Sequence, residues 1–203
     1  TVQAREGVTT GGGRGVSGGG TDSTRATCAG CAGDYDRSSH ASSVCVLAGA
    51  GVTMQVDYDY HGTVWLRDLK DAAELGHSAG QKAVARLNPG RPATGRYPVV
   101  FDPRVAGSFL GYFVGAITGT SIARGTSFLK DKMGQAIFAS TVGITDDPTR
   151  IKGLRSRPFD GEGMAVAPLS LVRDGVLQSW VLDSRSARQL GLQSNARAAR
   201  GTA

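Results

Sequence analysis

The chain has 203 residues, enough for one large domain or two small ones, and with 40% hydrophobic and 20% charged residues it has the composition of a globular protein able to bury a core. The formal charge of +6 permits contact with acidic partners. The arginines are scattered and rarely form runs, however, which argues against a nucleic-acid-binding groove.

The cysteine content and the opening of the chain bear on its compartment. Three cysteines, Cys28, Cys31 and Cys45, are too few for a disulfide scaffold and fit a reducing compartment. The first stretch, TVQAREGVTTGGG, lacks the apolar segment of a signal peptide. We therefore expect a cytoplasmic location. Because the chain does not begin with methionine, we also expect a fragment or a processed product.

The first part of the chain combines a glycine-rich start with a strand–strand–helix pattern. Residues 1–33 are rich in Gly, Ser and Thr without periodicity, and they predict a loop or an irregular strand. The stretches SSVCVLA at 42–48 and VTMQVDYDY at 52–60 predict two strands. Apolar residues then recur at helical spacing through 69–87, with Asp71 near the start, so a helix is expected there.

The second part begins with a linker. Residues 88–95 contain two prolines and two glycines, and the stretch RYPVVFDP at 96–103 predicts a short buried strand. Farther along, Asp174-Gly175 lies between apolar runs and predicts a β-hairpin turn. The arginine-rich stretch SRSARQLGL at 184–192 predicts a helix.

The stretch AGSFLGYFVGAITGTSIARG at 106–125 has no charge between Arg104 and Arg124. Its length would suit a membrane span, but serines, threonines and glycines lower its hydropathy. Glycine recurs every fourth residue from 107 to 119, which would give a helix one smooth face that another backbone can approach closely. We therefore predict a buried glycine-faced helix and no contact with a membrane.

Two groups of side chains are candidates for chemistry. The first is Cys28-x-x-Cys31 with His40 and Cys45, which together offer the four ligands that zinc requires. Cys45 alternates with valines, however, and such a thiol is more often a small buried residue. A zinc-knuckle-like binding module on these four residues is therefore kept as an alternative function.

The second group is the charged segment TDDPTRIKGLRSRPFDGEGMAVAP at 145–168. Arginine and carboxylate side chains in one loop can form bidentate pairs that brace the fold. They can also bind a peptide terminus or place a general base. We keep both interpretations open for the candidate substrate or partner contacts, which are Asp146, Asp147, Arg155, Arg157, Asp160 and Glu162.

Three stretches carry a resemblance to a known family. They are RYPVVFDPRVAGSFLGYFVGAITGTSIARGTSFLKDKMGQAIF, then DDPTRIKGLRSRPFDGEG, and finally GVLQSWVLDSRSARQLGL. Together they resemble the TldD/PmbA family, and specifically its PmbA branch, also called TldE. The likeness is strong from Arg96 to Leu192 and fainter from Gly33 to Pro89.

The resemblance implies a function that spacing alone does not. The family supplies the two subunits of a cytoplasmic metalloprotease that degrades unfolded or small peptides and matures some modified peptides. PmbA-type members also carry a description as modulators of DNA gyrase. The expected partner is a TldD-like zinc-bearing subunit in a heterodimer, and a homodimer is also considered.

In the TldD partner, the helix equivalent to 106–125 carries a His-Glu-x-x-x-His zinc motif. By that register Gly111 and Ala116 stand in place of the histidines and Tyr112 in place of the glutamate. None of the three is a usual zinc ligand or general base. The resemblance thus implies no catalytic residue and no metal in this chain, with zinc expected in the partner.

Family members are longer than this chain. The resemblance implies that their usual N-terminal part and C-terminal end are missing here. The expected fold class is α+β, in two pieces. Residues 1–90 are expected to be the end of an N-terminal α/β domain, and residues 91–203 the start of a β-rich C-terminal domain containing the glycine-faced helix.

Overall fold

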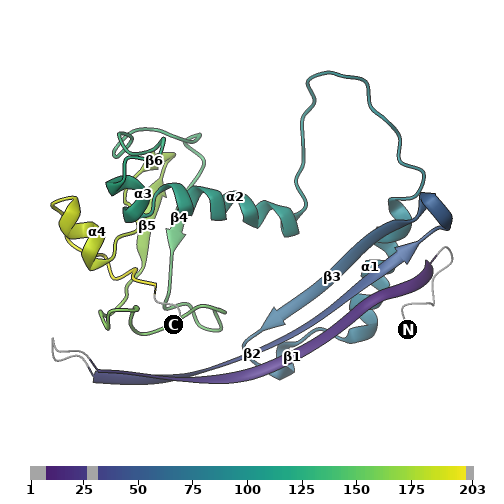
Figure 1. The fold of residues 1–203 in the computed structure, drawn as a ribbon, viewed down its shortest axis with the longest axis horizontal. Helices are drawn as coiled ribbons and strands as arrows, with labels where there is room; N and C mark the ends of the chain where they lie inside the picture. The colour runs from purple at the N-terminus through teal and green to yellow at the C-terminus, as the bar shows by residue number, and fades with distance from the viewer. Residues whose placement is uncertain (1–7, 27–31, 200–203) are drawn as a thin grey trace. The chain divides into compact units, whose positions relative to one another are not determined.

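A three-stranded sheet with one helix on its face forms the first unit of this computed structural model, which describes residues 8–26 and 32–199 (Figure 1). The strand order is β1-β2-β3, with β1 at Val8–Ala26, β2 at Ala32–Ala48 and β3 at Gln55–Thr63. The two strands predicted in this part are confirmed. β3 begins later than expected because Gly51–Thr53 form a short 3-10 turn.

The glycine-rich start is more regular than its composition suggests. Most of it forms β1, a regular strand beside β2. Side-chain periodicity is not needed there, because pairing of main-chain groups with the neighbouring strand is enough to order the backbone.

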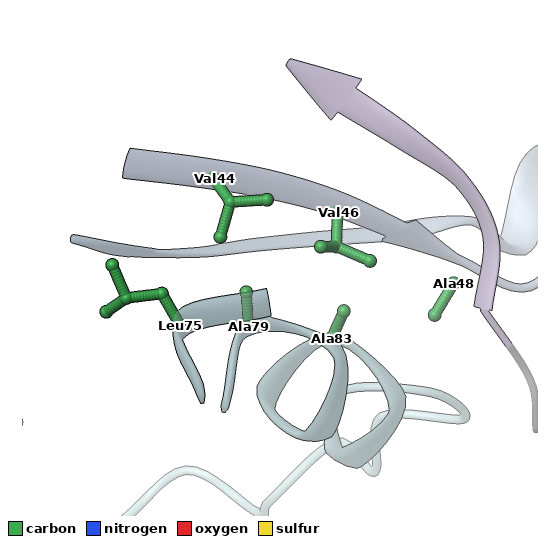
Figure 2. Close-up of a cluster of buried hydrophobic side chains, with 6 residues drawn as sticks. All are labelled: Val44, Val46, Ala48, Leu75, Ala79 and Ala83. Carbon is green, nitrogen blue, oxygen red and sulfur yellow. The ribbon is translucent and has the colours of Figure 1, made fainter. Parts of the chain in front are cut away.

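Helix α1 (Ala72–Ala85) confirms the prediction for 69–87. It starts where expected because the Asp71 side chain accepts hydrogen bonds from the amides of Ala73 at 2.7 Å and Glu74 at 3.4 Å. Residues spaced by four on α1 meet alternate residues of β2 (Figure 2). The core of this unit comprises Val44, Val46, Ala48, Leu75, Ala79 and Ala83.

The strand predicted at 96–103 is wrong. No regular structure forms between the end of α1 and Pro103, and Val99, Val100 and Phe101 are exposed, with Val100 at 97%. A strand needs a neighbour to satisfy its main chain, and none lies beside this segment in the described residues. Pro98 moreover has no N–H to donate to such a neighbour.

A second unit follows, formed mainly by residues 97–151 and 155–199. It contains a three-stranded antiparallel sheet of short strands, β4 (Ile144–Asp146), β5 (Leu169–Arg173) and β6 (Val176–Leu177). The expected hairpin turn joins β5 to β6, with φ of 50° at Asp174 and 77° at Gly175. The predicted helix near the end is α4 (Ser184–Gln189). The α+β class is thus confirmed.

The stretch 106–125 is two helices, α2 (Pro103–Ala116) and α3 (Gly119–Ala123). The break occurs where the chain pairs with Val181, whose amide donates to Ile117 O at 2.9 Å and whose carbonyl accepts from Gly119 N at 2.7 Å. Within the described residues, no helix combines the length and the apolar character that a membrane span requires.

The prediction that the glycine face is buried is wrong for α2. Only Phe113 of this helix is buried, and a Cβ placed at Gly107, Gly111 or Gly115 would have no atom within 4 Å. The reason is that only the C-terminal end of α2 reaches the core of the second unit. That core comprises Phe113, Ile117, Leu129, Leu171, Val172 and Leu177.

Gly119, the last glycine of the series, is the one that is enclosed. A Cβ there would overlap the Ser186 hydroxyl and lie 2.8 Å from Leu182 Cδ2. This glycine therefore lets α3 approach α4 and the segment before it closely.

These two environments predict opposite outcomes for the same substitution. Gly119→Ala should lower the free energy of unfolding by roughly 1–3 kcal/mol, because the extra methyl overpacks the contact with Ser186 and Leu182. Gly111→Ala should be neutral or should stabilise by up to about 1 kcal/mol, because alanine is the better helix former in an open position. Urea unfolding of both variants measures the difference. Equal destabilisation by the two would contradict the assignment of one enclosed and one open glycine.

Candidate functional site

The four carboxylates of the charged segment are all engaged within the chain. Asp160 is almost fully buried, at 2% exposure. Its Oδ1 accepts from the amides of Glu162 at 2.9 Å and Met164 at 3.0 Å, and its Oδ2 accepts from Ala198 N at 2.9 Å. One side chain thus folds the loop on itself and fastens it to the last described residues.

Glu162 connects the same loop to α4. Its Oε2 accepts from the amide of Ser184 at 3.0 Å and from the Ser184 hydroxyl. Although glycines flank Glu162, its side chain is not free. The carboxylate lies at the first turn of α4, where it satisfies an amide that has no partner within the helix.

The two aspartates at the start of the segment have different partners. Asp146 pairs with Arg197, whose Nε lies 2.5 Å from Asp146 Oδ2. Asp147 accepts from both the amide and the hydroxyl of Thr149, at 3.0 and 2.7 Å. The Thr149 hydroxyl and amide hold the pKa of Asp147 below its ordinary value.

Arg155 and Arg157, by contrast, form no ion pair with a carboxylate in the described part of the chain. Arg155 is exposed and Arg157 is half-buried, and the main-chain amide of Arg157 donates to Pro148 O at 2.8 Å. The expected bidentate pairs between loop arginines and loop carboxylates therefore do not form. The arginines and the carboxylates are close together in the sequence. In the structure, however, the carboxylates bind backbone amides and Arg197 instead.

Sequence reasoning missed the segment that binds two of these carboxylates, Asp146 and Asp160. Arg197 is buried and donates to the carbonyls of Asn195 at 2.8 Å and Ala167 at 2.6 Å besides pairing with Asp146. The Asn195 side chain bonds the main chain at Leu182 and Trp180, at 2.9 and 2.7 Å. The stretch SNARAA carries no periodic signal and could not be identified from sequence as a site.

A shallow hollow of about 360 Å³ lies beside α4. It is formed by one loop residue, by α4 and by the segment that follows α4. Its lining comprises Met164, Ser184, Ala187, Arg188, Leu192, Gln193 and Ser194.

Asp183 fixes the start of α4 at the edge of this region. Its carboxylate accepts from the Ser186 hydroxyl and from Ser186 N at 2.7 Å. These two hydrogen bonds hold the pKa of Asp183 below its ordinary value, although burial opposes the shift.

The zinc-knuckle alternative finds no support. Cys28 and Cys31 lie outside the described residues, and His40 and Cys45 both lie on β2. Five residues of strand separate these two by about 16 Å and place them on opposite faces, whereas ligands of one zinc lie within about 5 Å of each other. Within the ranges 8–26 and 32–199, no cluster of three or more potential metal ligands occurs.

The second half of the chain matches a known family domain. Residues 94–203 match the family domain described as the PmbA/TldA metallopeptidase C-terminal domain, which covers more than half of the chain. The chain belongs to the PmbA/TldA metallopeptidase family. Its resemblance to the PmbA branch is confirmed by a metalloprotease PmbA of Escherichia coli O157:H7, 37% identical over 81% of this chain and 36% of that protein.

Solved structures of the PmbA/TldA type share the fold. A candidate modulator of DNA gyrase from Bacteroides thetaiotaomicron superposes with a TM-score of 0.89 at 23% identity, over 96% of this chain and 44% of that one. TldE from Thermococcus kodakarensis superposes with a TM-score of 0.73 at 21% identity, over 90% and 41%. The chain spans about a third of the length of the curated PmbA relatives that it matches.

Gly111, Tyr112 and Ala116, the three residues that the resemblance aligned with a zinc motif, lie on α2. Gly111 faces open space, Tyr112 is 80% exposed, and Ala116 packs at the edge of the second core. The side chain of Tyr112 and the position of Gly111 are therefore accessible, although the next residue, Phe113, lies in the core of the second unit.

The buried Asp160 gives a test of the loop. Asp160→Asn should lower the free energy of unfolding by roughly 1–3 kcal/mol, because the new amide must direct an N–H at a backbone N–H that previously met an acceptor. Glu162→Gln is the matched change. It should cost less, because its remaining carbonyl oxygen can still accept from Ser184. Urea unfolding of both variants measures the two changes in the free energy of unfolding. Equal changes would argue against Asp160 as the residue that contributes most to holding the loop in place.

The lowered pKa of Asp183 predicts a pH dependence. A carboxyl whose pKa is lower in the folded than in the unfolded state stabilises fully above its unfolded pKa of about 4, and this contribution is lost as the pH falls through the folded value. Asp183→Asn, which keeps a capping oxygen, should therefore be less stable than the parent at pH 6. The difference should narrow toward pH 3. Urea midpoints at both pH values test this, and a constant difference would contradict it.

Proposed function

We propose that the chain is part of a PmbA/TldE-type subunit that supports peptide degradation or maturation together with a TldD-like, zinc-bearing partner in the cytoplasm. The observation that carries this proposal is the chemistry of α2. At the positions of the family zinc motif it offers glycine, tyrosine and alanine, which cannot assemble the usual zinc site. The chemistry of hydrolysis is then assigned to the partner.

The surface of α2 supports a role in assembly. Phe109 and Leu110 are each 51% exposed, and Phe101 packs edge-on against Phe109 at 4.6 Å between ring centroids. Exposed apolar side chains gathered around one helix are typical of a surface that another protein element covers. The only charged residue on α2, Arg104, pairs with Asp102 at 3.0 Å.

The loop arginines support contact with an anionic group. Because the neighbouring carboxylates bind other groups, neither Arg155 nor Arg157 is paired with an acidic side chain among the described residues. Such cations can pair with carboxylates of a partner subunit or of a peptide. Asp146, Asp147, Asp160 and Glu162 are assigned to bracing in this proposal, since each already has a partner within the chain.

Catalysis is tested with the purified 203-residue chain and a TldD-like subunit prepared separately. The chain alone should not hydrolyse unfolded peptides, whether or not zinc is added, because α2 cannot supply the motif. The two proteins should associate, as measured by light scattering. Chelator-sensitive hydrolysis by the chain alone, after removal of any TldD-like contaminant, would refute the division of roles.

The arginines are tested by neutral replacement. Arg155→Gln and Arg157→Gln should leave thermal unfolding nearly unchanged and should weaken association with the TldD-like subunit, more at low than at high salt. Lys130→Gln, which removes an exposed positive charge elsewhere in the same unit, serves as the control. A loss of melting temperature parallel to the loss of affinity would instead identify the arginines as supports of the fold.

A further inference from the structure

The side chains that line the hollow beside α4 have no role in the proposed association with a TldD-like subunit. Its two walls come from different parts of the chain, Met164 on the loop and Ser184 to Arg188 on α4, and the segment at 192–194 borders it. A volume of about 360 Å³ lies at the lower end of the range for small-ligand sites. That size suits one or two residues of a peptide.

The walls are held in place by hydrogen bonds within the chain. The amide of Met164 donates to Asp160 at 3.0 Å, the amide of Ser184 donates to Glu162 at 3.0 Å, and the Ser194 hydroxyl donates to Leu182 O at 3.2 Å. The carboxylates of the charged segment thus build the hollow without being its ligand-binding groups. A site organised before binding loses less entropy when its ligand arrives.

The groups that remain available are one cation, one amide and two apolar side chains. Arg188 and Gln193 are exposed, and neither has a side-chain partner among the residues the structure describes. The planar guanidinium of arginine matches a carboxylate with two parallel hydrogen bonds. Met164 and Leu192, 38% and 46% exposed, supply apolar surface beside it.

We propose that this hollow binds the C-terminal end of a peptide. Arg188 pairs with the terminal carboxylate, the Gln193 side chain bonds the peptide main chain, and Met164 and Leu192 contact an apolar last side chain. This assignment deepens the proposed function, on which it rests, by naming the part of the peptide that this subunit recognises.

The balance of charge favours a single carboxylate over a phosphate. A phosphate group carries nearly two negative charges at neutral pH and is usually met by several cations. Here one arginine lines the hollow, and Glu162 holds a negative charge against Ser184 on the same wall. One carboxylate next to an apolar side chain is the ligand that this lining complements best.

Binding is measured directly on the 203-residue chain, without any zinc subunit. The probes are a fluorescent hexapeptide that ends in leucine with a free carboxylate, the same peptide amidated at its C-terminus, and an amidated peptide that ends in glutamate. Fluorescence anisotropy should show the free acid binding about tenfold or more tightly than either amide. Arg188→Gln should remove this preference, and Arg188→Lys should retain part of it.

Arg173→Gln is the matched control, since it removes an exposed arginine of the same unit that does not line the hollow. It should leave the preference for the free acid intact. Equal affinity for acid and amide, equal affinity for the glutamate amide, no binding of any probe, or an unchanged preference in Arg188→Gln would each overturn the assignment. Because no cleavage is measured, such a failure is distinct from a failure of the division of roles between subunits.

Discussion

The carboxylate of Asp160 is the constraint on which the second unit depends. It is buried, and it meets three backbone amides that belong to two segments far apart in the chain. A buried charge of this kind is tolerated only when its hydrogen bonds are complete. The loop and the residues near Arg197 must therefore be in place together, and Glu162 connects the same loop to the first turn of α4. These segments therefore become ordered together, and none of them keeps this arrangement without the others.

Much of the fold could be predicted from local signals. The Asp71 cap, the alternation of β2 and the Asp-Gly turn each depend on neighbours within a few residues, so the sequence specifies them directly. The prediction of a strand at 96–103 was wrong because an apolar run does not reveal whether a partner strand exists. The break between α2 and α3 likewise depends on pairing with Val181, which lies more than sixty residues away.

The charged segment is evident in the sequence, but the partners of its side chains are not. Sequence reasoning found the charged segment, yet it paired arginines with carboxylates that are close only along the chain. The actual partners are backbone amides, Thr149, Ser184 and Arg197, and the last of these gives no periodic signal. Burial of the α2 glycines was predicted because a small-residue face implies a close neighbour, and of the four glycines at 107, 111, 115 and 119 only Gly119 has one among the described residues.

The exposed part of α2 can change in sequence with little effect on folding. Substitutions at Gly111 and Tyr112 meet neither the core nor another segment of the described chain, so metal ligands can be gained or lost there at little cost to folding. Ala116 and Phe113 lie nearer the core and are constrained by packing. Side chains on this part of the helix can therefore change while Phe113 and the residues packed around it keep the scaffold.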